Sequence, residues 1–341
     1  MSSTLCVNNL MARSGNAITI SGNLCLSSNA GVTLPTGTFN QRPANPANGT
    51  IRFNTSNNWL EYYYDSAWYY VSSTSLNNYN IEYLLVGGGG SGSTSIYGNA
   101  GGGAGGVLHN TSKTITAGTS YTVVVGAGAS GTIGSCNIIG GNTCFGVGIA
   151  YGGGSGSNNP GGSGGGGGHS NPPDQGGLSI QTSNDGGTGY GNRGGAMSYS
   201  APYYPNGGGG GAGAVGGSGS GSTAGAGGAG RYFTVSGSNV AYAGGGGANG
   251  QQGITAAGGV GGGGPGSAQY TSNPGCSGTS NTGGGGGAGG FNGPTAYPGG
   301  NGGSGIVILR YTGPQRGSGG SVTTIDGNTI HTFTSSGTYT A

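Results

Sequence analysis

The sequence contains very little charge. Asp, Glu, Lys and Arg together make up 4% of its 341 residues, and the formal net charge at pH 7 is +2. The basic residues form no cluster, so the sequence lacks the positive surface that binds phosphate backbones. We therefore expect no nucleic acid among its partners.

Long apolar runs are also absent. No stretch approaches 18 consecutive apolar residues, so we expect no transmembrane helix and no membrane insertion. The first segment, Met1–Leu10, lacks the basic flank and the apolar run of a secretory signal peptide. We therefore expect no signal peptide.

Cysteine and histidine are few and scattered. The cysteines are odd in number, form no CxxC pair and predict no dense disulfide framework: Cys6, Cys25, Cys136, Cys144 and Cys276. Cys136 and Cys144 could close a small loop, although free thiols are the favoured interpretation. The histidines, His109, His169 and His331, lie far apart in the sequence, and we expect no metal site.

The sequence also lacks the common signatures of enzymes. Lys113 is the only lysine and follows Ser112, which excludes a P-loop, and the many Gly-x-Gly-x-x-Gly matches carry no information among 93 glycines. The nonapeptide repeats of calcium-binding RTX proteins are missing. We expect no enzyme activity and no cofactor, and a glycan hydrolase with paired carboxylates is the enzymatic alternative.

Glycine is what the sequence has in abundance. The sequence has 93 glycines and 13 prolines. A content of Gly and Pro this high often indicates disorder, but disorder usually also requires high charge. This chain has little charge and instead carries 20 tyrosines. Glycine runs recur without the Gly-X-Y period of collagen, at residues 87–90, 101–103, 152–154, 164–168, 207–211, 244–247, 261–264 and 283–287.

These runs suit the polyglycine II conformation. This left-handed helix rises about 3.1 Å per residue and has no internal hydrogen bonds, so its N–H and C=O groups require neighbouring chains. Ile81–Val86, Ser120–Val125 and Ile306–Tyr311 read as strands that would give the runs an ordered base. We predict a sandwich of polyglycine II helices over residues 81–311, with a disordered segment as the alternative.

Shorter β segments flank this region. Residues 1–34 read as short strands for oligomerisation, because such strands cannot bury enough surface alone. In residues 35–80, Pro43 and Pro46 predict an extended connector rather than a paired strand. A three-stranded antiparallel meander with an aromatic face and a linker then follow. Residues 312–341 predict a small β-cap with a hairpin around Asp326-Gly327.

Two stretches resemble known families. The run QRPANPANGTIRFNT, with LEYYY and AWYYV, resembles a small module of bacteriophage tail fibres. YLLVGGGG, GGGAGGV, TITAGTSYTVVVGAGAS and GGSGIVILRY resemble the glycine-rich domain of phage adhesins and of some large-virus proteins. The resemblance implies stacked polyglycine helices whose loops at one end contact a host receptor.

Aromatic residues next to the glycine runs are the candidates for binding. They lie in segments that read as turns joining the helices, and Tyr with Ser, Asn and Gly forms adaptable contact surfaces. Packing over the helix ends is the alternative for each residue. The candidates are Tyr199, Tyr203, Tyr204, Tyr270, Phe291 and Tyr297.

The sequence thus predicts a mainly β protein with irregular structure and almost no α-helix. We expect a fibre or adhesin protein of a phage or virus particle, located in the virion or outside the cell and released by lysis. Its expected partners are further copies of itself, in a homotrimer or filament, other virion proteins, and a host-surface protein or glycan. A self-assembling structural filament without a receptor role is the alternative.

Overall fold

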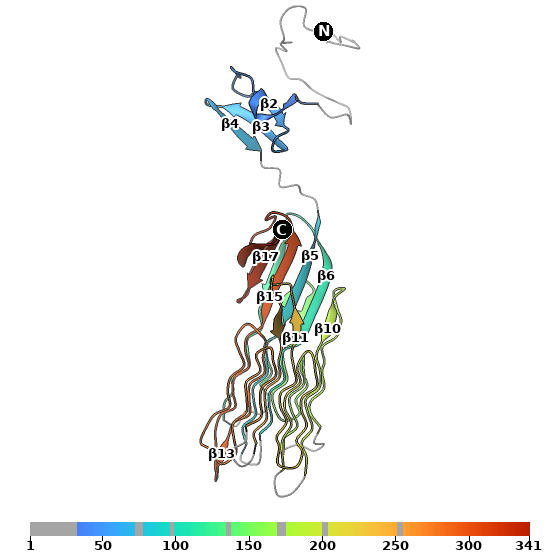
Figure 1. The fold of residues 1–341 in the computed structure, drawn as a ribbon, viewed down its shortest axis with the longest axis vertical. Coiled ribbons are helices and arrows are strands. Elements are labelled where there is room, and N and C mark those ends of the chain that lie inside the picture. The colour runs from blue at the N-terminus through green and yellow to red at the C-terminus, as the bar shows by residue number, and fades with distance from the viewer. Residues whose placement is uncertain are drawn as a thin grey trace, which may run out of the picture. The chain divides into compact units, whose positions relative to one another are not determined.

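The computed structural model describes residues 33–71, 78–95, 99–133, 138–168, 175–199, 204–250 and 255–341. The chain divides into two compact units, residues 1–74 and 75–341. Its regular elements are strands, and the described residues contain one short 3₁₀ helix, η1 (Phe39–Gln41) (Figure 1). The predicted fold class, mainly β with almost no α-helix, is therefore confirmed. The strands predicted in the first 32 residues lie outside the described residues.

The smaller unit is a four-stranded sheet in the order β1-β2-β3-β4. Strands β2 (Ile51–Asn54), β3 (Trp59–Tyr64) and β4 (Ala67–Val71) pair antiparallel, which confirms the predicted meander. Asn58 has a φ of 56° in the first turn, and Asp65 has a φ of 46° in the second. Asn and Asp tolerate this left-handed conformation better than most residues do, so local turn chemistry sets the strand ends.

The proline-rich connector was predicted only in part: the segment around Pro43 and Pro46 forms no strand, as expected, but the residues before it do. Strand β1 (Thr36–Gly37) pairs with β2 in parallel, and η1 follows it directly. Pro35 donates no hydrogen bond, but its carbonyl accepts one from the Phe53 N–H at 2.9 Å, as the Gly37 carbonyl does from Thr55 at 2.9 Å. Proline removes a donor and leaves the acceptors of the segment available, which is sufficient for a short parallel ladder at a sheet edge.

A six-stranded sheet organises the larger unit, in the order β10-β6-β5-β15-β17-β16. Strand β5 (Tyr79–Val86) leads into the glycine-rich region and β15 (Ile306–Thr312) leads out of it. The two strands pair antiparallel at the centre of the sheet, with Leu84 opposite Ile308. The other strands of this sheet are β6 (Val107–Ile115), β10 (Thr188–Tyr190), β16 (Ser321–Ile325) and β17 (Asn328–Phe333).

Both faces of this sheet are covered. A second sheet, β18-β7-β8-β9, encloses one core that includes Tyr83, Leu85, Phe145 and Leu309. The pair β11 (Arg231–Phe233) and β12 (Val240–Tyr242) contributes to a core on the opposite face, around Leu84 and Ile308. The second sheet contains β7 (Ser120–Val124), β8 (Thr143–Phe145), β9 (Gly148–Ala150) and β18 (Gly337–Thr340).

The three strands predicted around the glycine region, β5, β7 and β15, are confirmed, and so is the hairpin around Asp326-Gly327. That hairpin is formed by β16 and β17, and β17 pairs with β15. The C-terminal hairpin therefore continues the central sheet. Strand β18 then crosses to pair with β7 in the other sheet, so the last residues of the chain join the two sheets.

The glycine segments continue from the strands as rods that run to the opposite end of the unit (Figure 1). Consecutive amides in one rod bond to three different neighbours: Gly88 to Gly141, Gly89 to Gly303, and Gly90 to Gly103. Every third amide returns to the same neighbour at distances of 2.8–3.0 Å, as shown by Gly87, Gly90 and Ser93, which donate to the carbonyls of Gly106, Gly103 and Ala100. This threefold periodicity is that of polyglycine II, so the glycine region is an ordered sandwich.

At many positions inside this sandwich only glycine fits. A Cβ atom added to Gly89 would lie 2.0 Å from the carbonyl oxygen of Gly284, and one added to Gly209 would lie 1.9 Å from that of Gly102. The rods therefore pack main chain against main chain, with Cα–H groups directed at carbonyl oxygens. Strands β13 (Phe291–Asn292) and β14 (Thr295–Ala296) form a small hairpin at the end of the rods remote from the sheets (Figure 1).

Candidate binding surface at the loop end

The end of the rods that carries the β13–β14 hairpin is named here the loop end. Among the aromatic residues predicted to bind, the structure brings Tyr270 and Phe291 together there. Their ring centroids lie 5.5 Å apart in an edge-on arrangement, and Tyr270 is 62% exposed. The Gly290 amide donates to the Asn273 carbonyl at 3.1 Å, which joins the two loops that carry these rings.

Tyr270 has an unusual backbone conformation. Its φ is 58°, and Tyr204 has a φ of 43°. Among the described residues other than glycine with positive φ, these two are the only aromatic ones, and the rest are Asn, Asp, Ser and Ala. A bulky residue in the left-handed region costs about 1–3 kcal/mol. Glycine would avoid that cost. The sequence nevertheless places a tyrosine at both positions, although the backbone there is strained.

Tyr199 and Tyr204 lie in a different segment. The Ser198 amide donates to the Pro205 carbonyl at 2.9 Å, which brings the residues next to these two tyrosines together. Both tyrosines are exposed. Tyr203, the third tyrosine predicted here, lies outside the described residues.

Tyr297 follows the β13–β14 hairpin and is half-buried. Its amide donates to the Gly290 carbonyl at 3.0 Å, so it extends the pairing at the base of the hairpin. This geometry favours packing over the rod ends for Tyr297. Tyr199, Tyr204 and Tyr270 are the exposed candidates, and Phe291 is half-buried like Tyr297.

A buried asparagine network supports these loops. The Asn249 side-chain carbonyl accepts from the Asn99 amide at 3.2 Å and from Asn206 Nδ2 at 3.1 Å. Asn99 Nδ2 also donates to the Gly289 carbonyl at 2.8 Å, just before β13. All three asparagines are fully buried. One cluster of side chains therefore joins four rods at the bases of their loops.

Sequence reasoning missed this network. Each of the three asparagines is followed directly by Gly or Ala at one end of a rod segment, and that position was the available signal. The Oδ1 atoms of Asn99 and Asn206 have no hydrogen-bond partner in the structure. Buried polar atoms of this kind are rare and costly, and ordered water is their usual partner.

Several titratable side chains of the larger unit lie at the sheets. Asp185 accepts a hydrogen bond from the Tyr83 hydroxyl at 3.0 Å and forms an ion pair with Lys113. Burial, followed by the nearby Asp185 charge, raises the pKa of Tyr83 above its ordinary value. His109 lies 2.9 Å from Glu82. These partners satisfy one another, so the clusters are typical of structural pairing.

The part of the chain that the structure describes carries no evident metal site. No group of three or more His, Cys, Asp or Glu side chains is placed to hold a metal ion there. No described helix is both long and apolar enough to cross a bilayer. Cys144 is a free thiol among the described residues, and Cys136, its alternative disulfide partner, lies outside them.

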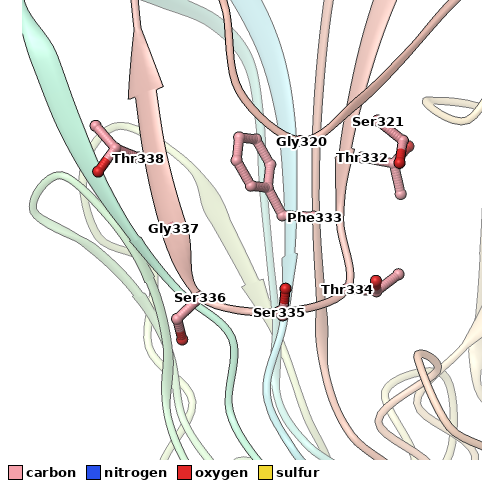
Figure 2. Close-up of a pocket in the computed structure, with 9 residues that line it drawn as sticks. All are labelled: Gly320, Ser321, Thr332, Phe333, Thr334, Ser335, Ser336, Gly337 and Thr338. Carbon is pink, nitrogen blue, oxygen red and sulfur yellow. The ribbon is translucent and has the colours of Figure 1, made fainter.

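A depression of about 270 Å³ lies where the chain passes from β17 to β18 (Figure 2). The Phe333 ring lies beneath Gly320, and hydroxyl groups surround it, from Ser321, Thr332, Thr334, Ser335, Ser336 and Thr338. Ser336 Oγ accepts a hydrogen bond from the Val125 amide at 3.0 Å. The lining contains no acid, base or thiol, and the Ser336 hydroxyl serves the crossing between the two sheets through its hydrogen bond with the Val125 amide.

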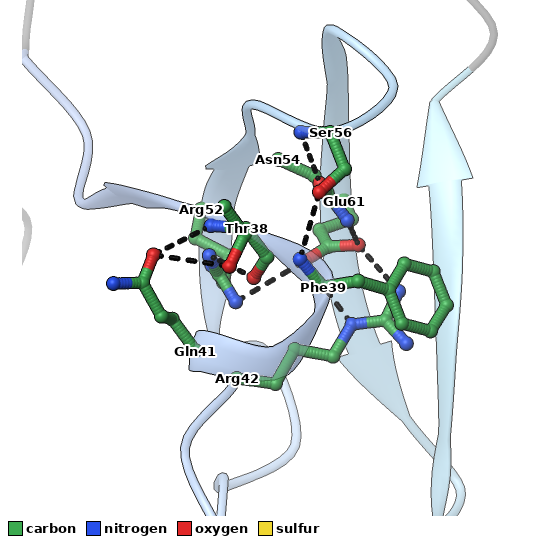
Figure 3. Close-up of polar contacts among 8 residues, drawn as sticks. All are labelled: Thr38, Phe39, Gln41, Arg42, Arg52, Asn54, Ser56 and Glu61. Carbon is green, nitrogen blue, oxygen red and sulfur yellow. Dashed lines mark hydrogen bonds and ion pairs between the residues drawn. The ribbon is translucent and has the colours of Figure 1, made fainter.

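The smaller unit contains a polar centre of its own (Figure 3). Arg42 Nη2 donates to Glu61 Oε2 at 2.5 Å, and Asn54 Nδ2 donates to the same oxygen at 3.0 Å. The hydrogen bond from Arg42 is the largest influence on Glu61 and lowers the pKa of this carboxyl, against the opposing effect of burial. The guanidinium of Arg42 also lies over the rings of Phe39 and Trp68.

Residues 67–312 match the family described as glycine-rich domain. The chain belongs to this glycine-rich domain family. The match extends from β4 to the last residue of β15, so it includes every rod between β5 and β15. A comparison with curated proteins gave no match to this chain. The glycine-rich domain therefore holds the loop-end aromatic residues on rods whose packing depends on the absence of side chains.

Proposed function

We propose that the chain is a structural fibre or adhesin protein of a phage or virus particle. In this proposal the N-terminal region attaches to other virion proteins, copies of the chain assemble as a homotrimer, and the loop end binds a host-surface protein or glycan. The particle would be released by lysis, which places the protein in the virion or outside the cell. The loops, rather than a catalytic centre, carry the function.

The strained tyrosines of the loop end are the main support. Tyr204 and Tyr270 hold exposed aromatic rings on backbone that favours glycine, in a chain where glycine is the commonest residue. Backbone strain of this kind collects at ligand-contacting positions. Tyrosine also offers a large contact area at low conformational cost.

The rods add rigidity to this surface. Contact residues bind best when rigid elements position them, because less conformational entropy is lost on binding. The asparagine network holds the bases of the loops in place and adds to this rigidity. The resemblance to phage adhesins agrees with this arrangement.

Adsorption experiments test the proposal. We expect Tyr270→Ala and Tyr204→Ala each to weaken binding of the purified chain to host cells about tenfold, which corresponds to about 1.4 kcal/mol. Tyr232→Ala is the matched control, because Tyr232 is 56% exposed but lies on β11, next to the sheets. Binding of both loop-end variants at the level of the control would contradict the proposed role of these loops.

A self-assembling filament is the second candidate. Strand β16 is an edge strand of the six-stranded sheet, and all five of its residues are exposed. An exposed edge can pair with another chain. Electron microscopy of the purified protein separates the two functions, because an adhesin gives discrete particles and a filament gives fibres of indefinite length.

A further inference from the structure

In the smaller unit, polar and charged side chains are buried and apolar ones are not. Among residues 33–71, the buried side chains are Arg52, Asn54 and Glu61, and no apolar side chain is buried. Exposed aromatic and aliphatic side chains surround this charged centre. Apolar burial is the main source of folding stability, so this unit lacks that source within its own described residues.

The register assigns these exposed side chains to two faces of the sheet. Glu61 lies opposite Arg52 on one side and Tyr70 on the other, and η1 with Arg42 covers this polar face. The side chains of the other face come from the alternate positions of the same strands. We name this other face the apolar face. Two of its rows cross all three strands, Phe53–Leu60–Val71 and Ile51–Tyr62–Tyr69, and the pair Tyr64–Ala67 completes it.

The apolar face is continuous and uncharged. Tyr62 and Tyr69 stack with centroids 5.5 Å apart, which confirms that they share this face. Ile51, Tyr62, Tyr64, Tyr69 and Val71 are all exposed. No described element of the smaller unit covers them. Contiguous apolar patches of this kind usually mark interaction sites.

The apolar face needs a covering surface. Small sheets are stable when an apolar face is buried against something else, and the described residues of the smaller unit supply no such surface. No disulfide or metal cluster is found in the described part of this unit. Oligomerisation is a common way for a small sheet to gain such a surface.

We propose that the apolar face is the surface through which copies of this chain associate. The same face on the other copies of the homotrimer is the best occupant, because these faces carry no charge that would repel one another and every copy supplies one face. Three such faces around a threefold axis enclose one shared core, which suits these rows of Tyr, Leu, Ile and Val. The inference deepens the assembly part of the proposed function, but it involves no receptor.

Two neighbouring tyrosines provide a matched test. Tyr69 is 43% exposed on the apolar face, and Tyr70 is 59% exposed on the polar face. Each stacks on a ring of β3, Tyr69 on Tyr62 and Tyr70 on Trp59, so a lysine at either position removes one comparable contact. Only the lysine at 69 would place a charge in the proposed interface.

Light scattering on the full chain measures the result. We expect the wild-type mass to be a multiple of 32.3 kDa. Tyr69→Lys should raise the dissociation constant at least tenfold, whereas Tyr70→Lys should leave it unchanged. A monomeric wild-type chain, or equal masses for the two variants, would overturn the proposal.

The tryptophans supply a second readout, because Trp59 and Trp68 are the only two in the chain. If folding of the smaller unit is coupled to association, the unfolding midpoint seen by tryptophan fluorescence rises with protein concentration. A midpoint independent of concentration would contradict the proposal even if Tyr69→Lys failed to fold. Adsorption tests at Tyr204 and Tyr270 remain separate, so failure of receptor binding and failure of association are distinguishable.

Discussion

At the scale of single residues, a buried histidine in the core should make the stability depend on pH. His331 is fully buried within β17, between the two sheets. Its Nδ1 lies 2.8 Å from the Gly319 carbonyl and its Nε2 lies 3.0 Å from the Tyr311 hydroxyl. The carbonyl can only accept, so Nδ1 carries the proton and Nε2 accepts from the tyrosine. This arrangement satisfies the neutral imidazole.

We predict a loss of stability in weak acid that depends on His331. Burial lowers the pKa of His331 below its ordinary value of 6.5. As the pH falls below about 6.5, the unfolded state binds a proton before the folded state does, so the unfolding free energy decreases. The unfolding free energy should fall by at most about 1.4 kcal/mol per pH unit, and this contribution should stop falling once the pH is below the lowered pKa of His331.

Denaturant unfolding between pH 8 and pH 5 measures this slope, and NMR titration of the His331 ring measures its pKa directly. His331→Gln should unfold with a flatter pH dependence across the same range. Titration of His331 above pH 6.5 in the folded protein would contradict the prediction.

At the scale of elements, the rods depend on a side chain being absent. Gly166 and Gly168 belong to one run, yet their surroundings differ. A Cβ at Gly166 would lie 1.9 Å from the Gly207 carbonyl oxygen, whereas one at Gly168 would meet its nearest atom at 3.4 Å, the hydroxyl oxygen of Ser157. Neither glycine has a positive φ, so the two positions differ in packing rather than in backbone strain.

Gly166→Ala is therefore predicted to destabilise the larger unit, and Gly168→Ala is its matched control. Forcing a methyl group into a well-packed interior costs about 1–3 kcal/mol. We expect Gly166→Ala to lower the unfolding free energy in urea by at least this amount relative to Gly168→Ala. Equal stability of the two variants would mean that the rods separate easily enough to admit a methyl group.

The elements also show how far the sequence could predict this fold. Strands β5, β7 and β15, the meander and the β16–β17 hairpin follow from local alternation and turn residues, so they were predictable. The short strands β8, β9, β11 and β12 have three residues each, too few for a periodic signal. The pairing of rods was also unpredictable, because glycine carries no side chain that could specify one neighbour over another.

The candidate site was predictable to a similar degree. Aromatic residues next to glycine runs indicated the loop end, and the structure joins Tyr270 with Phe291 there. The positive φ of Tyr204 and Tyr270 was not predictable, since tyrosine seldom adopts that conformation. The contacts of the Asn249 network join residues far apart in sequence, Asn99 with Asn249 and Asn206 with Asn249, and no local pattern reports such distances.

At the scale of the whole molecule, the two units use opposite means of stabilisation. The larger unit buries main chain against main chain in the rods and conventional apolar cores at the sheets. The smaller unit buries Arg52, Asn54 and Glu61 and buries none of its described apolar side chains. The rods are bonded to one another within one chain, whereas the apolar face is proposed to associate with other copies. The rigidity of the rods and the proposed association can therefore be tested independently.

The rods should open only together. The five amides of residues 207–211 donate to the carbonyls of Gly167, Gly217, Gly246, Gly164 and Ala214 at 2.8–2.9 Å. Freeing this one segment means separating it from several neighbours at once, and each neighbour is bonded to others in the same way. We therefore predict that these amides exchange with solvent only through global unfolding, with similar protection for all five.

Hydrogen exchange read by mass spectrometry measures this protection, with the exposed β13–β14 turn at Gly293 as the fast-exchanging reference. Exchange of residues 207–211 as fast as that of Gly293 would show that the rods open locally, and the loop end would then lack the rigid support on which its proposed role depends.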